Sequence, residues 1–194
     1  MRRWSETAER VTATSRTSEK VRLLAEYLRT LTPAELPTAV TFFTGRPFPE
    51  RDPRVLGLGW AAIDEVVQAE ADAAPGALGR AYDRSSDLGR AVFDVLDESR
   101  RRPSGELPTL TDVRDTFAAI AAASGAEAKA VPFRTLLWRS DPLVAKYHCI
   151  IEEQAETFVL TDLGARSGVF VTCTDFPVAT SATNTWEASS KFAM

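Results

Sequence analysis

The sequence predicts an all-α domain with an internal two-fold repeat, followed by a segment of different character. Apolar residues recur at helical spacing through most of the chain up to about residue 155. In addition, residues 20–33 recur 109 positions later as residues 129–142. Each copy combines an apolar-faced helix, a capped turn, a proline and a second helix. We therefore expect residues 1–155 to form a pseudo-two-fold helical domain, and residues 156–194 to form an irregular or disordered tail.

The repeat also matches apolar positions between the two copies. The matched pairs are Leu24 with Phe133, Leu28 with Leu137, and Val40 with Cys149. A two-fold arrangement of helix pairs is typical of a binding scaffold and not of an active site. The alternative is a chance recurrence within helical sequence.

Composition restricts the class of protein. With 44% hydrophobic residues and a net charge of −4, the chain has an ordinary globular composition and is not basic overall. This charge disfavours nonspecific nucleic-acid binding by the whole surface but permits a local basic face. No apolar run approaches the roughly 20 residues of a membrane helix, and the N-terminus does not resemble a secretory signal. Cys149 and Cys173 lack metal-ligand spacing, so we expect free thiols and a cytoplasmic protein without a membrane partner.

The first third of the chain predicts three helices. A short helix is expected at residues 4–11, and residues 14–18 form a break rich in capping residues. Residues 32–35, Thr-Pro-Ala-Glu, have the pattern of a capping box with proline at the first helical position. Expected core-facing residues on the second and third helices are Val21, Leu24, Ala25, Leu28, Val40, Phe42 and Phe43.

The middle of the chain alternates loops with helices. Residues 46–53 carry three prolines and form a loop, and residues 71–79 form an Ala/Gly/Pro linker. Helices are expected from 56–60 through Val67, from Asp87 and from Thr109. Their inward residues are Ile63, Val66, Val67, Ala91, Val92, Val95, Leu96, Val113, Phe117 and Ile120.

Residues after Glu156 change in character. Residues 158–160 and 169–172 are β-branched and aromatic, which is typical of strands. Residues 180–190 are rich in Ser, Thr and Ala, so we expect disorder there.

Catalytic residues are scarce. The single histidine, His148, adjoins Cys149, but neighbouring positions on a helix point about 100° apart and do not make a nucleophile pair. We expect His148 to lie near the surface of a helix. Gly57-Leu58-Gly59 lacks the third glycine and the preceding strand of a dinucleotide site.

The same glycines suggest a phosphate contact. They permit close backbone approach where a helix begins, and free amides at a helix N-terminus bind phosphate. Arg46, Arg51 and Arg54 lie just upstream. A purely structural turn is the alternative.

Several segments together resemble a known family. Residues 14–28 and 31–36, then Thr44-Gly45-Arg46 and Leu56-Gly57-Leu58-Gly59-Trp60, resemble the N-terminal DNA-binding domain of ATP-dependent DNA ligases. Further similar segments, in the same order, are residues 87–89, 110–113, 124–125 and 142–147.

This resemblance implies an all-helical, pseudo-two-fold domain whose related turns contact the minor groove and the phosphates flanking a nick. It places the amides of Gly57 and Gly59 against phosphate, with Arg46 and Arg54 as charge partners. Further DNA-binding candidates are Arg16 and Lys20.

The sequence also departs from the family. At the repeat offset, Thr44-Gly45 falls on Glu153-Gln154, so the second turn is missing. No lysine lies in the Lys-x-Asp-Gly motif that accepts AMP in these ligases. We expect no ligase activity from this chain alone; ATP and Mg²⁺ are implied only for a full-length ligase.

We therefore predict a chain that grips duplex or nicked DNA in repair, recombination or replication, with a separate ligase catalytic chain as a possible partner. One explanation is a truncated or frame-shifted ligase gene, and another is a stand-alone adaptor. The alternative functions are a protein-interaction module or a remnant that no longer functions. A small-molecule enzyme has no supporting set of residues.

Overall fold

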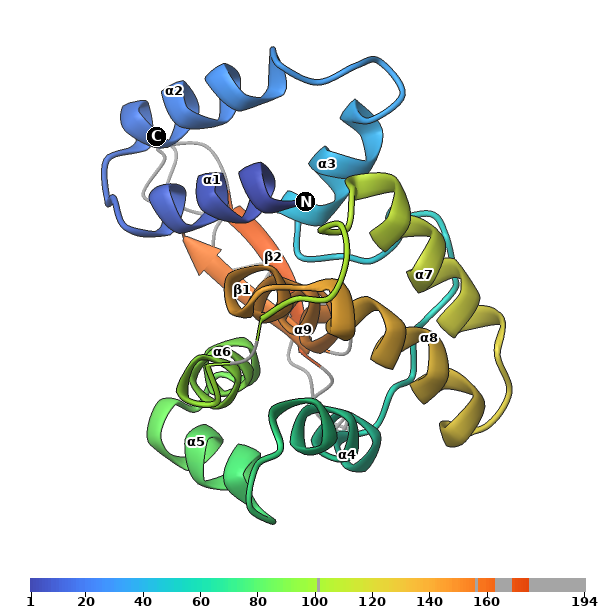
Figure 1. Ribbon diagram of the computed structural model, residues 1–194. Coiled ribbons are helices and arrows are strands. Elements are labelled where there is room, and N and C mark those ends of the chain that lie inside the picture. Colours follow the sequence, from blue (N-terminus) through green and yellow to red (C-terminus); the bar gives the residue numbers. More distant parts are fainter. Residues whose placement is uncertain (101, 156, 163–168, 175–194) are drawn as a thin grey trace, which may run out of the picture.

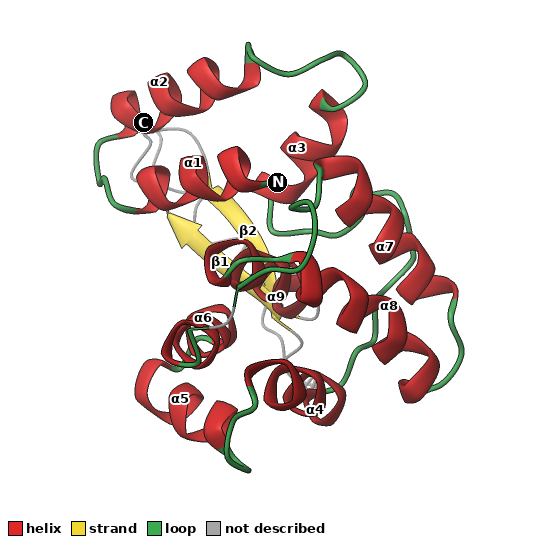
Figure 2. Cartoon of the chain, in the orientation of Figure 1, coloured by secondary structure: helices red, strands yellow, loops and turns green. Residues whose placement is uncertain are grey.

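The structure is a computed structural model that describes residues 1–100, 102–155, 157–162 and 169–174. All regular elements in the described part of residues 1–155 are helices, as predicted (Figures 1 and 2). The helices are α1 (Arg2–Thr12), α2 (Thr17–Leu28), α3 (Leu36–Phe43), α4 (Trp60–Ala71), α5 (Ala77–Ser85), α6 (Leu88–Glu98), α7 (Leu110–Ala122), α8 (Ala126–Arg139) and α9 (Pro142–Ala155).

The predicted repeat is present as two three-helix units. Adding 109 to the residue numbers of α1 and α2 places them within α7 and α8, and α3 falls within α9. The contacts between the units are reciprocal, because α1 packs on α9 while α7 packs on α3. Helices α4 to α6 lie between the two units in sequence and in the lower part of Figure 1. The domain is therefore pseudo-two-fold.

Equivalent caps organise the third helix of each unit. The Glu35 amide donates to Thr32 Oγ1 at 3.4 Å, and the Thr32 amide donates to Glu35 Oε2 at 3.0 Å, which completes the predicted capping box. In the other unit the Val144 amide donates to Asp141 Oδ1 at 2.9 Å. Thr32 and Asp141 are 109 residues apart, as are Glu35 and Val144. Helix α3 begins only at Leu36, because residues 33–35 form a turn.

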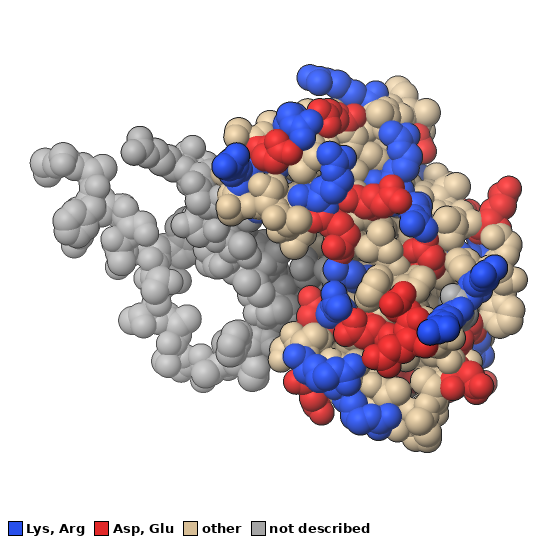
Figure 3. All heavy atoms as spheres, turned by 60° about the vertical axis from the view of Figure 1, so that its left-hand side comes forward, with Lys and Arg blue, Asp and Glu red and all other residues tan. Residues whose placement is uncertain are grey.

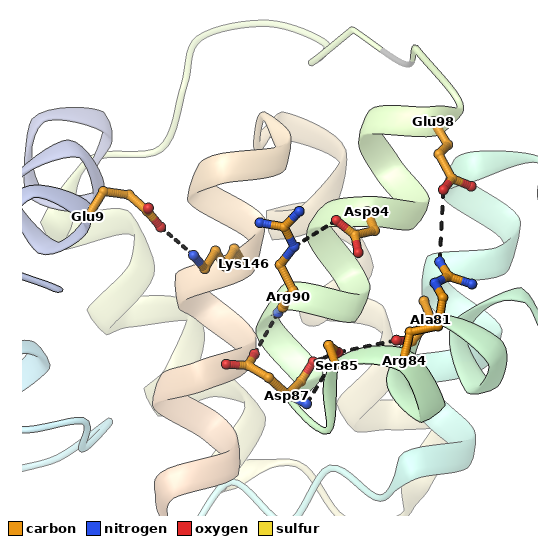
Figure 4. Close-up of polar contacts among 9 residues, drawn as sticks. All are labelled: Glu9, Ala81, Arg84, Ser85, Asp87, Arg90, Asp94, Glu98 and Lys146. Carbon is orange, nitrogen blue, oxygen red and sulfur yellow. Dashed lines mark hydrogen bonds and ion pairs between the residues drawn. The ribbon is translucent and has the colours of Figure 1, made fainter. Parts of the chain in front are cut away.

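Helices α4, α5 and α6 cover the second unit. Helix α4 packs on α8 and α6 packs on α9, while α5 packs on α6. Asp87 caps α6 by accepting from the Arg90 amide at 2.6 Å, and Arg84 of α5 pairs with Glu98 at 3.9 Å (Figure 4). The predicted linker at residues 71–79 is too long, because α5 already begins at Ala77. Buried Leu78 anchors this helix.

An aromatic cluster holds the two units together. Trp4 of α1 stacks on Phe43 at 4.6 Å between ring centroids and meets Phe42 and Tyr147 edge-on. Its indole Nε1 donates to the Ala39 carbonyl at 3.1 Å. The residue is only 2% exposed, so α1 is bound to α3 of its own unit and to α9 of the other.

A partly buried ion pair also joins α1 to α9. Lys146 of α9 donates to Glu9 of α1 (Figure 4), and the Tyr147 hydroxyl donates to the same carboxylate at 3.0 Å. Burial raises the pKa of Glu9, but these hydrogen bonds and the Lys146 charge outweigh it, so the pKa is lowered overall.

The predicted core faces are confirmed on α4, α6 and α7, where all the inward residues named from the sequence are buried. On α2 and α3 part of the prediction is wrong. Val21 is 60% exposed and Val40 is 45% exposed. The buried residues of α2 are instead Leu23 and Tyr27. The reason is that no described helix covers the outer face of this unit.

Two strands occur at the segments beyond residue 156 whose residues are typical of strands, within the tail that was predicted to be irregular or disordered. Strands β1 (Thr157–Asp162) and β2 (Val169–Thr174) pair antiparallel, with Thr157 opposite Thr174, and lie against α9. The disorder predicted at residues 180–190 lies outside the described residues. Within the described ranges no helix combines the length and apolar character needed to cross a membrane.

Candidate nucleic-acid interface

An extended segment, residues 52–59, leads from the loop after α3 into α4. Leu56 and Leu58 are buried, with 1% and 5% of their surface exposed, whereas Gly57 and Gly59 are exposed. The leucines therefore hold the segment on the domain, and backbone without side chains is exposed at residues 57 and 59.

The two glycines are required for different reasons. Gly57 has φ of +59°, and a Cβ at this position would lie 2.9 Å from Lys129 Nζ. Gly59 has φ of −75° and open space around the position of a Cβ. Gly57 is thus needed for the fold of the segment, whereas the fold itself tolerates a side chain at Gly59.

Gly59 is also the N-cap of α4. The first intrahelical bond is donated by the Ala62 amide to the Gly59 carbonyl at 3.0 Å. The amides of Trp60 and Ala61 precede it and have no intrahelical acceptor. Such a helix N-terminus favours an anion, both through its free amides and through the helix dipole.

Arg54 belongs to this segment and is held by Asp52. Its guanidinium donates to both carboxylate oxygens of Asp52, with Nη2 to Oδ2 at 2.6 Å, and it sits over the Phe48 ring at 4.3 Å. The same hydrogen bonds lower the pKa of Asp52. Arg54 is therefore well positioned, but Asp52 offsets much of its charge.

Arg46 follows the turn that ends α3. Gly45 has φ of +74° and its amide donates to the Phe42 carbonyl at 3.0 Å, which closes the helix. Arg46 Nη2 lies 3.9 Å from Glu50 Oε1, a pair that is largely solvated on the acidic side. Both arginines predicted from the sequence thus have a carboxylate close by.

Arg16 and Lys20 are placed elsewhere. Arg16 is the N-cap of α2, and Lys20 lies in the first turn of that helix. In Figure 1 this end of α2 is on the left, whereas the segment leading into α4 descends on the right. The structure therefore does not bring the Arg16–Lys20 pair together with the glycines.

The residue that sequence reasoning missed at this site is Lys129 of α8. Its Nζ donates to the Leu56 carbonyl at 2.5 Å and lies 3.4 Å from the Gly57 carbonyl. Lys129 occupies the repeat position of Lys20, so the repeat itself was the signal that singled it out. Lys129 fixes the extended segment to the second unit.

Charge is mixed on one face of the molecule. Figure 3 turns the left-hand side of Figure 1 forward, and basic and acidic side chains are interspersed on the face shown. Among the residues whose placement is described, no cluster of His, Cys, Asp and Glu has the composition of a metal site. At the candidate site both predicted arginines have a carboxylate nearby, so its distinguishing feature is the exposed backbone at Gly57 and Gly59.

His148 is not near the surface, contrary to the sequence-based prediction. It is fully buried, with Nδ1 3.4 Å from Ser140 Oγ and the ring edge-on to Phe117. Burial lowers the pKa of His148 to about 3, so the ring is neutral at physiological pH. His148 is buried because it lies on the apolar face of α9, which turns inward. The sequence held a signal for this position, because His148 is four residues after the buried Val144 and so shares its helix face.

Comparison with known proteins identifies the family. A family model described as DNA ligase N terminus matches residues 1–155, so the chain belongs to this family. A second model, described as FHA domain, matches residues 132–180 and overlaps the first over α8 and α9.

Similar proteins are DNA ligases. The chain is 42% identical over 102 residues to a probable DNA ligase of Opitutus terrae, which covers 53% of this chain and 10% of the relative. It is 35% identical over 143 residues to a probable DNA ligase of Koribacter versatilis, covering 74% and 24%. It is 30% identical over 123 residues to DNA ligase 1 of Korarchaeum cryptofilum, covering 63% and 21%. The chain thus spans about a tenth to a quarter of the length of these relatives.

Proposed function

We propose that this chain grips duplex DNA near a nick, through the sugar-phosphate backbone, in support of ligation during repair, recombination or replication. Membership of the DNA ligase N-terminal family and similarity to proteins named DNA ligases support this role. The 194 residues contain no Lys-x-Asp-Gly motif, so the role that we propose for them is DNA gripping and not nucleotide transfer.

The observation that carries the proposal is the side-chain-free outer edge of residues 57–59 next to the N-terminus of α4. A phosphate can approach the backbone closely there and accept from amides. Arg46 and Arg54 precede this edge in the sequence, and we propose that they supply positive charge to it. Contacts of this kind position DNA and carry no base specificity.

Replacing Gly59 with leucine is expected to weaken DNA binding at a cost of about 1 kcal/mol or less in unfolding free energy, because leucine is a poorer N-cap residue than glycine. The backbone at Gly59 is ordinary and the space beside it is open, so the side chain fits but prevents close approach of a phosphate. We expect a loss of about tenfold in affinity, which corresponds to one good charge-assisted hydrogen bond. Binding to a nicked duplex and the urea midpoint would be measured together.

Gly57→Ala is the matched comparison. Its positive φ and the contact with Lys129 predict a loss of roughly 1 kcal/mol in unfolding free energy. Unchanged DNA affinity in Gly59→Leu would contradict the assignment of this edge as a phosphate site.

The double variant Arg46→Gln with Arg54→Gln is expected to bind DNA more weakly and with a smaller salt dependence. Each lost phosphate contact reduces the slope of log affinity against log salt by about 0.9, so two contacts reduce it by about 1.8. Affinity would be measured on nicked and intact duplex at several salt concentrations. Arg84→Gln on α5 is the control, because Arg84 pairs with Glu98 away from the site.

A variant that is expected to bind DNA more tightly tests the same assignment from the opposite direction. Asp52→Asn removes the carboxylate that now occupies Arg54, so DNA affinity should rise. An unchanged slope in the double variant and an unchanged affinity in Asp52→Asn would together show that these arginines do not contact DNA.

A protein-interaction module is the second candidate. The net charge of −4 and the acid partners of Arg46 and Arg54 favour it. A chain with a folded helical spectrum that fails to bind DNA at low salt would support this function in place of DNA binding.

A further inference from the structure

Equivalent apolar residues in the two three-helix units differ in how much of their surface is exposed. Val21 on α2 is 60% exposed, whereas Ala130, its counterpart on α8, is 6% exposed. Leu24 is half-buried, whereas its counterpart Phe133 is 1% exposed. The same face is thus open on one helix and closed on its equivalent.

The third helices show the same asymmetry. Leu36 and Val40 of α3 are 39% and 45% exposed. Their counterparts at the repeat offset, Ala145 and Cys149 of α9, are fully buried. Two independent helices therefore expose an apolar face in the first unit that is buried in the second.

The cover of the second unit explains the difference. Helix α4 packs on α8 and α6 packs on α9, both below α2 and α3 in the view of Figure 1. Polar contacts fasten this cover, because Lys129 donates to the Leu56 carbonyl and Arg134 pairs with Glu65 of α4 at 3.3 Å. The segment that covers the second unit, called the cover below, thus consists of the extended residues 52–59, its lead, followed by amphipathic helices.

The described part of the chain does not repeat this cover. The repeat offset places the equivalent of α4 at residues 169–180, of which 169–174 form strand β2. Strands β1 and β2 lie against α9, and α2 packs chiefly on α1. The match to the ligase N-terminal family likewise ends at residue 155.

We propose that this open face, formed by Val21, Leu24, Leu36 and Val40, binds an amphipathic helical segment of another polypeptide. The segment lies as α4 and α6 lie on α8 and α9. An extended apolar lead precedes its first helix, and Lys20 donates to a carbonyl of that lead as its counterpart Lys129 does to Leu56. The internal symmetry of the fold defines both the place and the kind of occupant, independently of whether the chain binds DNA.

The probe is a synthetic peptide of residues 54–98, which is the natural cover of the equivalent face. The full chain, isotope-labelled, is titrated with this peptide, and NMR shifts locate the contact. We expect saturable binding with shifts at Val21, Leu24 and Val40. The double variant Val21→Asp with Val40→Asp should weaken it at least about tenfold, because each carboxylate enters an apolar contact.

Val131→Asp is the matched control. Val131 is a similarly exposed valine, at 57%, but it lies on α8 outside the open face, so binding should be unchanged. Lys20→Gln should give a smaller loss than the double aspartate variant. Both Val21 and Val40 are exposed, so these changes should leave the unfolding midpoint close to that of the parent chain.

Three results would overturn the proposal. The first is no binding at millimolar peptide, and the second is equal binding by the double aspartate variant. The third is a set of shifts confined to α8 and α9, which would mean that the peptide merely displaces the chain's own cover. Self-association that Val21→Asp abolishes, without peptide uptake, would identify a second copy as the occupant and also overturn it.

Discussion

Replacing Trp4 with alanine is expected to lower the free energy of unfolding by about 3–5 kcal/mol, the range for truncating a buried aromatic side chain. The residue is 2% exposed and contacts Phe42, Phe43 and Tyr147. Its loss also leaves the Ala39 carbonyl without the indole donor. Because Trp4 joins α1 to helices of both units, the damage falls on the contact that unites the repeat.

Urea unfolding followed by circular dichroism would measure this effect. Trp138→Ala is the control, because Trp138 is 52% exposed and its truncation should cost about 1 kcal/mol or less. A Trp4→Ala protein no less stable than Trp138→Ala would show that the aromatic cluster does not hold the units together. Loss of cooperativity in Trp4→Ala would instead show that the units can separate.

The helix positions were predictable because their signals are local. Thr109 begins α7 with a capping box to Asp112, and Asp87 caps α6, both readable from a few neighbouring residues. The repeat was also visible, since Thr32 and Asp141 occupy equivalent capping positions. Helix α5 was missed because its Ala- and Gly-rich start resembles a linker.

The faces of α2 and α3 were not predictable in the same way. Periodicity identifies an apolar face, but it does not say whether another helix covers that face. Val21 and Val40 have the spacing of core residues and are nevertheless exposed. The failure of the pattern at these positions is the observation on which the proposed docking face rests.

The sequence indicated the glycines of the candidate site but only some of the side chains around them. The exposed glycines and the helix that begins at Trp60 lie where the sequence indicated them. The contact of Lys129 with the Leu56 carbonyl spans 73 residues, so it depends on tertiary structure. The pairing of Arg54 with Asp52 is local, but the sequence alone does not specify it.

Acidification is expected to destabilise the protein through His148. Burial lowers the pKa of this residue to about 3 in the folded chain, against 6.5 for an exposed histidine. The unfolded chain therefore binds a proton that the folded chain does not bind between these two values. The contribution of neutral His148 to the free energy of unfolding is fully present above pH 6.5. It falls by roughly 1.4 kcal/mol for each pH unit below 6.5, down to the pKa of the folded chain.

His148 is the only histidine, so no other imidazole contributes in this range. Between pH 6.5 and pH 4.5 we expect its contribution to fall by about 2–3 kcal/mol, a large share of the stability of a small domain. Carboxylates whose pKa is lowered, including Glu9 and Asp112, add a further loss as the pH falls toward their folded values. A histidine-specific comparison is therefore needed to separate the two causes.

His148→Gln provides that comparison, because glutamine is of similar size and does not titrate. Ser140 Oγ keeps its bond to the Leu136 carbonyl at 2.8 Å, so the hydroxyl is not left unpaired. Urea unfolding of both proteins at pH 6.5, 5.5 and 4.5 should show a steeper loss in the parent chain, while the carboxylate contribution cancels. Parallel losses in the two proteins would mean that His148 becomes protonated without unfolding, and hence that water reaches a side chain buried beneath Phe117 in the structure.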